Sequence, residues 1–312
     1  MSRLNHIDYY IPAEELPIDT LLEKVPDAAI PKMFSDRDEY TMFVKGILNL
    51  ESVRVEPTLN KGDMIGGLIE KMFERRVVEP TDIDIIIVAQ ETATDALSNL
   101  GHYLQFKHKM THAHVMTISG NHCVNVEMAL SVAAEMMKGN EQLKNILIVS
   151  ATRTEDINRR LLGSFGVYGD AAGILLMGRK EEGPYLLDKE ILCHGELYEV
   201  NMVKDNSITL CRLYLKCLKG LLNKRPTAGE TVARVLIQNA NPLLTNQCLA
   251  SAGFNDNKIF KKNLAKYGHL NQVDFIVNLK DVLAEPTLTK DDQIMSFGSG
   301  WAGTYIASLF AF

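Results

Sequence analysis

The chain has 312 residues, 46% of them hydrophobic and 23% charged, which is the composition of an ordinary globular protein. A formal net charge of −6, with no block of lysine or arginine, argues against nucleic acid as the main partner. The apolar runs are too short to cross a membrane, and the first residues lack the apolar core of a signal peptide. The five cysteines are scattered and odd in number, so we expect free thiols and a cytoplasmic location.

The first part of the chain predicts alternating strands and helices, because apolar runs with strand and helix periods follow one another. Strands are predicted at 3–11 and 82–89. Helical segments are predicted within 17–35 and 36–49, at 63–76, and at 96–106, the last capped by residues 92–95.

The central stretch of the chain carries a candidate nucleophile. A strand at 114–118 leads through Ser119-Gly120-Asn121 to Cys123, beside which a long helix begins. Residues 124–137 are apolar nearly all the way round, so we expect this helix to be buried. The dipole and free N–H groups at its start favour a thiolate, which makes Cys123 a candidate for nucleophilic catalysis. A buried structural cysteine is the alternative.

The strand predicted at 145–150 completes a strand–helix–strand unit with a right-handed crossover. A glycine-rich turn at 165–173 leads into a further strand. The rest of the chain repeats this alternation of helices and strands. Helices are predicted at 207–224, 242–253 and 271–283, and strands at 235–237, 293–297 and 304–310. No low-complexity linker interrupts the chain, so an α/β fold of two similar halves packed face to face is predicted.

Three other groups of residues have a chemical interpretation. Gly298-Ser299-Gly300 can bring backbone N–H groups to a ligand, as an oxyanion site needs, or can simply connect two strands. His269 lies in a loop before a helix, where histidines are often functional. His108, His112 and His114 have no matching carboxylate or thiol, so no metal site is predicted.

Together these segments resemble the β-ketoacyl-acyl-carrier-protein synthase III family of the thiolase fold, nearly from end to end. The family's nucleophile lies between a strand and a buried helix, as Cys123 does. Its "Phe-Gly-Asp-Gly-Ala-Gly" segment corresponds to Tyr168-Gly169-Asp170-Ala171-Ala172-Gly173. Its terminal "Phe-Gly-Gly-Gly" loop corresponds to Phe297-Gly298-Ser299-Gly300.

The resemblance implies a five-layer αβαβα sandwich of two pseudo-equivalent halves, residues 1–178 and 179–312. The first half would carry the nucleophile, and the second the remaining catalytic residues. It also implies a homodimer in which Cys123 lies buried at the foot of a tunnel. The N–H groups of Cys123 and Ser299, with Gly298 beside them, would form the oxyanion hole.

Two segments depart from the family pattern. Such synthases carry a histidine in "His-Gln-Ala-Asn" and an asparagine in "Gly-Asn-Thr-Ser", which together bind the malonyl thioester carbonyl and stabilise the enolate. Here Gln238 stands in place of the histidine, and His269 in place of the asparagine. Gln238 can donate a hydrogen bond but cannot carry a proton, whereas His269 can serve as a base. Self-acylation of Cys123 is therefore expected to survive, and decarboxylative condensation is left open.

The predicted substrate is an acyl thioester. The family stacks the adenine of coenzyme A between a tryptophan and an arginine; Tyr40 matches the tryptophan, but Leu162 replaces that arginine and Val44 replaces a second one. We therefore expect an acyl carrier protein as donor in preference to free acyl-coenzyme A, with no tightly bound cofactor and no metal. A candidate docking patch for an acidic carrier consists of three lysines, Lys258, Lys261 and Lys262.

The predicted activity is acyl transfer through a Cys123 thioester to a carbon nucleophile, in fatty-acid-like or specialised (polyketide) metabolism. His269 would act as general base, with Gln238 and Asn241 orienting the second substrate. One alternative is a non-decarboxylating acyltransferase whose acceptor is an amine or a hydroxyl. Another, of a different class, is a non-catalytic partner subunit of a ketosynthase heterodimer. Thioester hydrolysis is a third.

Overall fold

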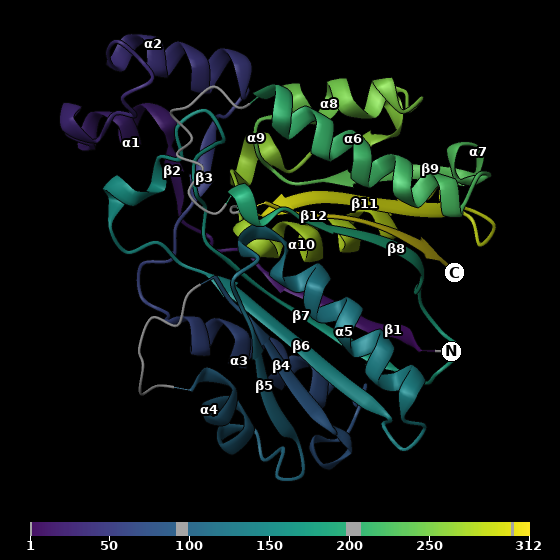
Figure 1. Cartoon of the computed structure of the whole chain (residues 1–312). Helices are drawn as coiled ribbons and strands as arrows, with labels where there is room; N and C mark the ends of the chain where they lie inside the picture. Colours follow the sequence, from purple (N-terminus) through teal and green to yellow (C-terminus); the bar gives the residue numbers. More distant parts are fainter. Residues whose placement is uncertain (1, 92–98, 198–206, 301–302) are drawn as a thin grey trace.

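Two five-stranded sheets with matching strand order lie at the centre of the structure (Figure 1). The computed structural model describes residues 2–91, 99–197, 207–300 and 303–312. The first sheet has the order β1-β7-β6-β4-β5, with β1 (Arg3–Tyr10), β4 (Ile85–Ala89), β5 (His114–Ile118), β6 (Asn145–Thr152) and β7 (Ala171–Gly178). The second has the order β8-β12-β11-β9-β10, with β8 (Tyr185–Cys193), β9 (Val232–Ile237), β10 (Ile259–Phe260), β11 (Gln293–Gly300) and β12 (Thr304–Ala311).

The two sheets also match in the direction of their strands. In the first sheet β4 runs parallel to β5 and β6, and β7 is antiparallel to β6 and β1. In the second sheet β9 runs parallel to β10 and β11, and β12 is antiparallel to β11 and β8. This repeat confirms the predicted α/β fold of two pseudo-equivalent halves. The division at residue 178 stays a prediction, although one sheet ends at Gly178 and the other begins at Tyr185.

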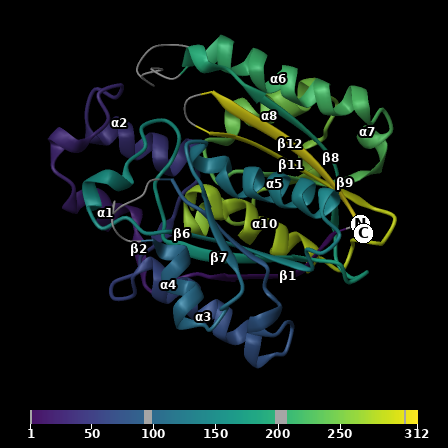
Figure 2. The same cartoon turned by 60° about the horizontal axis from the view of Figure 1, so that its bottom comes forward.

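Helices lie outside and between the sheets, which gives five layers (Figures 1 and 2). The helices α3 (Lys61–Glu74) and α4 (Leu100–Lys107) cover the outer face of the first sheet. The helices α6 (Ser207–Lys224) and α8 (Pro242–Ser251) cover the outer face of the second. Between the sheets lie α5 (Asn125–Gly139) and α10 (Asp274–Leu283), which share one core with residues of both sheets.

Shorter elements complete the chain. The helices α1 (Ile18–Lys24) and α2 (Arg37–Met42) pack with a small sheet of β2 (Glu15–Pro17) and β3 (Ser52–Arg54). The remaining short helices are α7 (Ala228–Thr231) and α9 (Leu264–Tyr267). None of the helices among the described residues has the length and apolar character needed to cross a bilayer.

The helix that follows Cys123 was predicted to be buried, and most of its length lies buried between the two sheets, although some positions reach the surface. Its buried positions face the two sheets and α10, whereas Val132 is 36% exposed and Glu135 and Lys138 are also exposed. The charges of Glu135 and Lys138 are typical of exposed positions, whereas the exposure of Val132 could not be read from the sequence, because an uncovered apolar side chain looks like one that is packed.

Other differences concern single elements. The strand β8 was not predicted, because its charged centre, Asp188-Lys189-Glu190, hides the apolar pattern of an edge strand. Residues Gly298–Gly300 belong to β11 and are not a connecting loop. The predicted cap at 92–95 and the start of the helix predicted at 96–106 fall on residues 92–98, outside the described residues; α4 itself begins at Leu100.

Candidate active site

Cys123 lies where the sequence predicted, between a strand and a helix. It occupies a short 3-10 turn, His122–Val124, that follows β5 and precedes α5. Gly120 in the approach to this turn has a φ of +85°, a conformation that glycine adopts without strain. Cys123 as a residue is partly buried and not fully enclosed, and the tunnel stays a prediction.

The backbone of His269 is fixed beside this turn by a second segment. Its N–H donates to the Val167 carbonyl at 2.9 Å, and its carbonyl accepts from the Gly169 N–H at 3.0 Å. A side chain at residue 169 would put its Cβ 2.1 Å from the Tyr267 carbonyl oxygen, so this approach requires glycine. The Tyr168 ring stacks on the imidazole with a centroid separation of 5.5 Å. These contacts explain why the segment matching the family motif lies next to His269.

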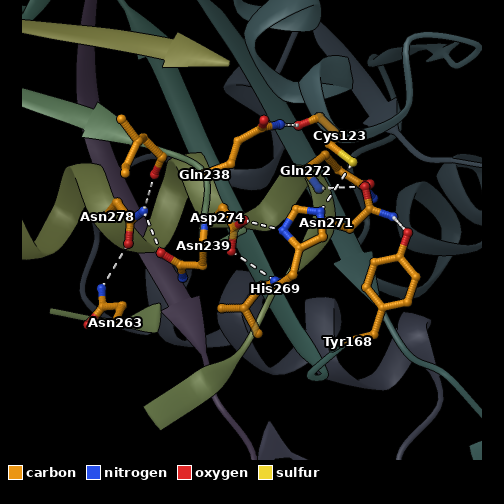
Figure 3. Close-up of polar contacts among 12 residues, drawn as sticks. Cys123, Tyr168, Gln238, Asn239, Asn263, His269, Asn271, Gln272, Asp274 and Asn278 are labelled. Carbon is orange, nitrogen blue, oxygen red and sulfur yellow. Dashed lines mark hydrogen bonds and ion pairs between the residues drawn. The ribbon is translucent and has the colours of Figure 1, made fainter. Parts of the chain in front are cut away.

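Cys123, His269 and Asp274 form a chain of polar contacts (Figure 3). The Cys123 Sγ lies 3.2 Å from His269 Nε2, and His269 Nδ1 lies 2.6 Å from Asp274 Oδ2. Burial disfavours the charged imidazole, but the charge of Asp274 and the contact with Cys123 outweigh it and raise the pKa of His269 well above its usual value. The imidazole can therefore hold a proton while the sulfur attacks a thioester carbon.

Asp274 was not among the predicted site residues. It is the first residue of α10, and its Oδ1 accepts from the Leu270 N–H at 2.8 Å while its Oδ2 also accepts from the Asn239 N–H at 2.8 Å. Only 1% of its surface is exposed, so these donors replace water around the carboxylate. The available signal was an aspartate shortly after a loop histidine, at the start of a predicted helix.

A ladder of buried amides lies behind Asp274 (Figure 3). Asn278 Nδ2 donates to Asn239 Oδ1 at 3.1 Å, and Asn263 Nδ2 donates to Asn278 Oδ1 at 2.9 Å. Asn263 also donates to Asp281 Oδ2 at 2.8 Å, and Asp281 Oδ1 accepts from the Tyr9 hydroxyl at 2.7 Å. This amide ladder connects the surface end of α10 to the residue that orients the imidazole.

Gln238 lies close to Cys123 but is bound to the backbone. Its Oε1 accepts from the Ser299 N–H at 3.1 Å, and its Nε2 donates to the Ser299 carbonyl at 2.9 Å. The Nε2 also donates to the Cys123 carbonyl at 3.4 Å (Figure 3). The Ser299 hydroxyl lies 2.5 Å from the Tyr214 hydroxyl. The predicted oxyanion donor, the Ser299 N–H, therefore already has a partner in this structure. The oxyanion role of Ser299 and the orienting role of Gln238 stay predictions.

The glycines of β11 allow the strand to approach the Cys123 turn. A Cβ at Gly300 would lie 1.9 Å from the Asn121 carbonyl oxygen. A Cβ at Gly298 would lie 3.2 Å from Gln238 Cδ and 3.3 Å from the Val124 side chain. The predicted glycine motif thus has a packing role at residue 300, and the predicted part of Gly298 in an oxyanion hole stays a prediction.

Asn241 caps a helix and Tyr40 lies in the core, whereas both residues were predicted to contact a substrate or coenzyme A. Asn241 Nδ2 donates to the Ser164 carbonyl at 2.9 Å, and its Oδ1 accepts from the Leu243 N–H at 3.0 Å, so it caps α8. Tyr40 was expected to stack on adenine, but it is fully buried in the core of the α1–α2 region, as is Val44. In this conformation Tyr40 offers no ring face to coenzyme A, and its role in cofactor binding stays a prediction.

The three lysines of the candidate docking patch have partners among the described residues. Lys261 contacts Asp256, Lys262 lies 2.6 Å from Glu285, and Lys258 donates to the Gly229 carbonyl at 3.3 Å. The charges of Lys261 and Lys262 are therefore partly neutralised, and a role of the three lysines in docking stays a prediction.

Comparisons with known proteins find similarity in sequence and in fold. No family model matches the chain. A curated β-ketoacyl-[acyl-carrier-protein] synthase III from Aquifex aeolicus strain VF5 is 22% identical over 243 residues, covering 74% of this chain and 78% of the relative. Its counterpart from Lactococcus lactis subsp. cremoris strain SK11 is 20% identical over 99% of both chains.

Solved structures show the same fold. The crystal structure of 3-oxoacyl-[acyl-carrier-protein] synthase III from Aquifex aeolicus VF5 has a TM-score of 0.81 and 18% identity, with all of both chains covered. ChlB3, described as an acyltransferase, has a TM-score of 0.83 and 16% identity over 99% of this chain and 97% of its own. The chain is therefore similar, in sequence and in fold over nearly its whole length, to β-ketoacyl-[acyl-carrier-protein] synthase III enzymes.

Proposed function

We propose that the chain accepts an acyl group on Cys123 from a thioester donor and passes it to a second substrate. The observation that carries this proposal is the contact of Cys123 Sγ with His269 Nε2 at 3.2 Å, backed by Asp274. His269 supplies a proton to the departing donor thiol as the Cys123 thioester forms. It is then the base for the second substrate.

The donor is an acyl thioester of an acyl carrier protein or coenzyme A, since the relatives are named for a carrier-protein synthase. The burial of Tyr40 and Val44 favours the carrier protein, because these residues offer no surface for adenine or phosphates. We place the reaction in fatty-acid-like or polyketide metabolism, because the relatives are named for a carrier-protein synthase. Free thiols at all five cysteines support a reducing compartment such as the cytoplasm.

The acceptor belongs to one of two classes. Condensation with a carbon nucleophile is the reaction that the relatives' name describes. Transfer to an amine or a hydroxyl is favoured by Gln238, whose amide is bound to the Ser299 and Cys123 backbone and cannot carry a proton. The His269–Asp274 pair suits this second class, because it can accept the proton that an N–H or O–H nucleophile must lose.

We propose a homodimer that forms through the edge of the first sheet. Among the described residues β5 pairs only with β4, and Met116 on this strand is 36% exposed. An edge of this kind is a template for pairing with another strand, and a second copy of β5 would satisfy it.

The test is the intact mass of the protein after brief incubation with acyl-carrier-protein and acyl-coenzyme A thioesters. We expect an added acyl mass with at least one donor and none in Cys123→Ala. A properly folded protein that acquires no mass from any donor would support a non-catalytic partner subunit. Incubation of the acylated protein with malonyl carrier protein, amines and alcohols then identifies the acceptor.

A further inference from the structure

A second carboxylate, Glu91, and a second imidazole, His122, lie near Cys123 and His269, and the proposed transfer does not use them. Glu91 comes two residues after β4, and His122 directly precedes Cys123 in the turn after β5. Because β4 and β5 run parallel with Ala89 opposite Ile118, both residues lie at the same end of the sheet. The Asn125 side chain donates to the Gln90 carbonyl at 2.9 Å, which joins the two segments.

Glu91 is tied to the catalytic group through Asn271. Asn271 Nδ2 donates to Glu91 Oε2 at 2.5 Å and lies 3.5 Å from the Tyr168 hydroxyl, whose ring stacks on His269. The other carboxylate oxygen of Glu91 lies 3.5 Å from His122 Nδ1. Glu91 therefore belongs to the set of side chains that surrounds Cys123 and His269.

Glu91 is ionised and reachable. Its contact with His122 lowers its pKa more than burial raises it, and Asn271 and His269 add to the lowering. The Glu91 side chain is 36% exposed and that of His122 is 32% exposed. Asp274, by contrast, is 1% exposed and bound to His269 and two backbone N–H groups. Of these two carboxylates, only Glu91 can meet an incoming molecule.

We propose that Glu91, with Asn271 and His122, forms the subsite for the second substrate, and that this acceptor is a primary amine. A fixed negative charge near the thioester attracts an alkylammonium group and repels the carboxylate of a malonyl thioester. A neutral hydroxyl gains nothing from that charge. This inference rests on the proposed thioester at Cys123 and names the acceptor that discharges it.

The transfer balances without a further reactant. The ammonium bound at Glu91 loses one proton to solvent, to which Glu91 and His122 are open. The neutral nitrogen attacks the thioester carbon, a C–N bond forms and the C–S bond breaks. The second proton of the nitrogen passes to His269 Nε2 and from there to the Cys123 sulfur. The products are an amide, the free thiol and one proton.

The experiment follows the discharge of acylated protein by intact mass, with propylamine, 1-propanol or malonyl carrier protein as acceptor. We expect the wild type to discharge to propylamine about tenfold faster than to either other acceptor. Glu91→Gln should lower the ratio of amine to alcohol discharge by about tenfold or more, and Glu91→Lys should lower it further. Each ratio is measured within one variant, so a change in its loading with acyl group cancels.

Glu70→Gln is the matched control, because Glu70 also lies beside a histidine, with its Oε1 3.9 Å from His108 Nδ1, and is 54% exposed. It should leave the ratio within about twofold of the wild type. An unchanged ratio in Glu91→Gln, or faster discharge of the wild type to 1-propanol or malonyl carrier protein, overturns the amine subsite while the Cys123 thioester stands. A wild-type protein that never acquires the acyl group overturns the proposed function, and this inference with it.

Discussion

Gln238 and Ser299 exchange two hydrogen bonds, side-chain oxygen to backbone N–H at 3.1 Å and side-chain nitrogen to backbone carbonyl at 2.9 Å. These two hydrogen bonds join Gln238, which directly follows β9, to β11 next to Cys123. They give the glutamine a structural role that its place in the sequence did not reveal. In the free protein the Ser299 N–H is occupied, so a substrate oxyanion would have to displace Gln238 Oε1.

Gln238→Met keeps the length of the side chain and removes both hydrogen bonds. We expect the free energy of unfolding to fall by about 2–4 kcal/mol, because two backbone groups of Ser299 lose their partner. Urea denaturation measures this change. The control is Gln142→Met at an exposed position, which should change stability by less than about 0.5 kcal/mol. A stable Gln238→Met protein that cannot be acylated would show instead that the amide acts on the substrate.

Asp274→Asn tests the orientation and charge of the imidazole. The carboxylate of Asp274 helps to raise the pKa of His269. The neutral amide of the variant lacks this charge, so the pKa of His269 should fall and the imidazole should lose its proton at a lower pH. We expect alkylation of Cys123 by iodoacetamide at pH 6 to slow by about tenfold or more, with partial recovery as the pH rises. Asp291→Asn, at an exposed position outside the amide ladder, is the control and should leave the pH profile unchanged. Equal pH profiles for wild type and Asp274→Asn would remove Asp274 from the mechanism.

The buried side chain of Glu127 should make the free energy of unfolding depend on pH. It lies buried on α5, with no hydrogen-bond partner for Oε2 among the described residues. Burial, with a smaller effect of the Asp274 charge, raises its pKa from 4.5 to about 8. Because the pKa is higher in the folded protein, the stabilisation is complete below pH 4.5 and is lost as the pH rises towards 8.

The test of Glu127 compares wild type and Glu127→Gln by urea denaturation at several pH values. Between pH 5 and pH 8 the wild type should lose about 3 kcal/mol more stability than the variant, since each pH unit in this window contributes about 1.4 kcal/mol. Parallel stability curves for the two proteins would mean that Glu127 is ionised, or paired, in solution.

Gly300→Ala tests the close approach of β11 to the nucleophile's turn. The new methyl group would overlap the Asn121 carbonyl, so we expect a loss of about 1–3 kcal/mol in unfolding free energy and slower acylation of Cys123. Gly67→Ala is the matched control: no described atom lies within 4 Å of its Cβ position in α3, and alanine should be neutral or stabilise that helix by up to about 1 kcal/mol. Acylation of Gly300→Ala at the wild-type rate and with wild-type stability would show that the turn has room to move.

Local patterns predicted much of the fold. The run Ile85–Ala89 is buried throughout and was predicted as a central strand, and the strand–turn–helix pattern correctly placed Cys123, the candidate nucleophile, between a strand and a helix. His269 was identified because it departs from a known motif at a loop position. These features depend on residues close together in the chain.

The missed features depend on contacts that no local sequence pattern predicts. Gln238 binds the backbone of residues 123 and 299, and no spacing in the sequence reveals that pairing. Tyr40 could not be placed, because an aromatic residue in an amphipathic segment packs in the core as readily as it binds a ligand. Asp274 follows His269 by five residues across a loop, which matches no helix or strand period.

The amide ladder has a consequence for how variation in this chain should be interpreted. Three of its members, Asp274, Asn278 and Asp281, are on one helix, but the others come from as far away as Tyr9. A change near the N-terminus is thus coupled to the imidazole through successive hydrogen bonds. In saturation mutagenesis, substitutions at Tyr9, Asn263 and Asn278 should show epistasis with His269, although none of these three residues touches it in the structure described. Sequence distance from the nucleophile will therefore be a poor guide to which variants of this protein are silent.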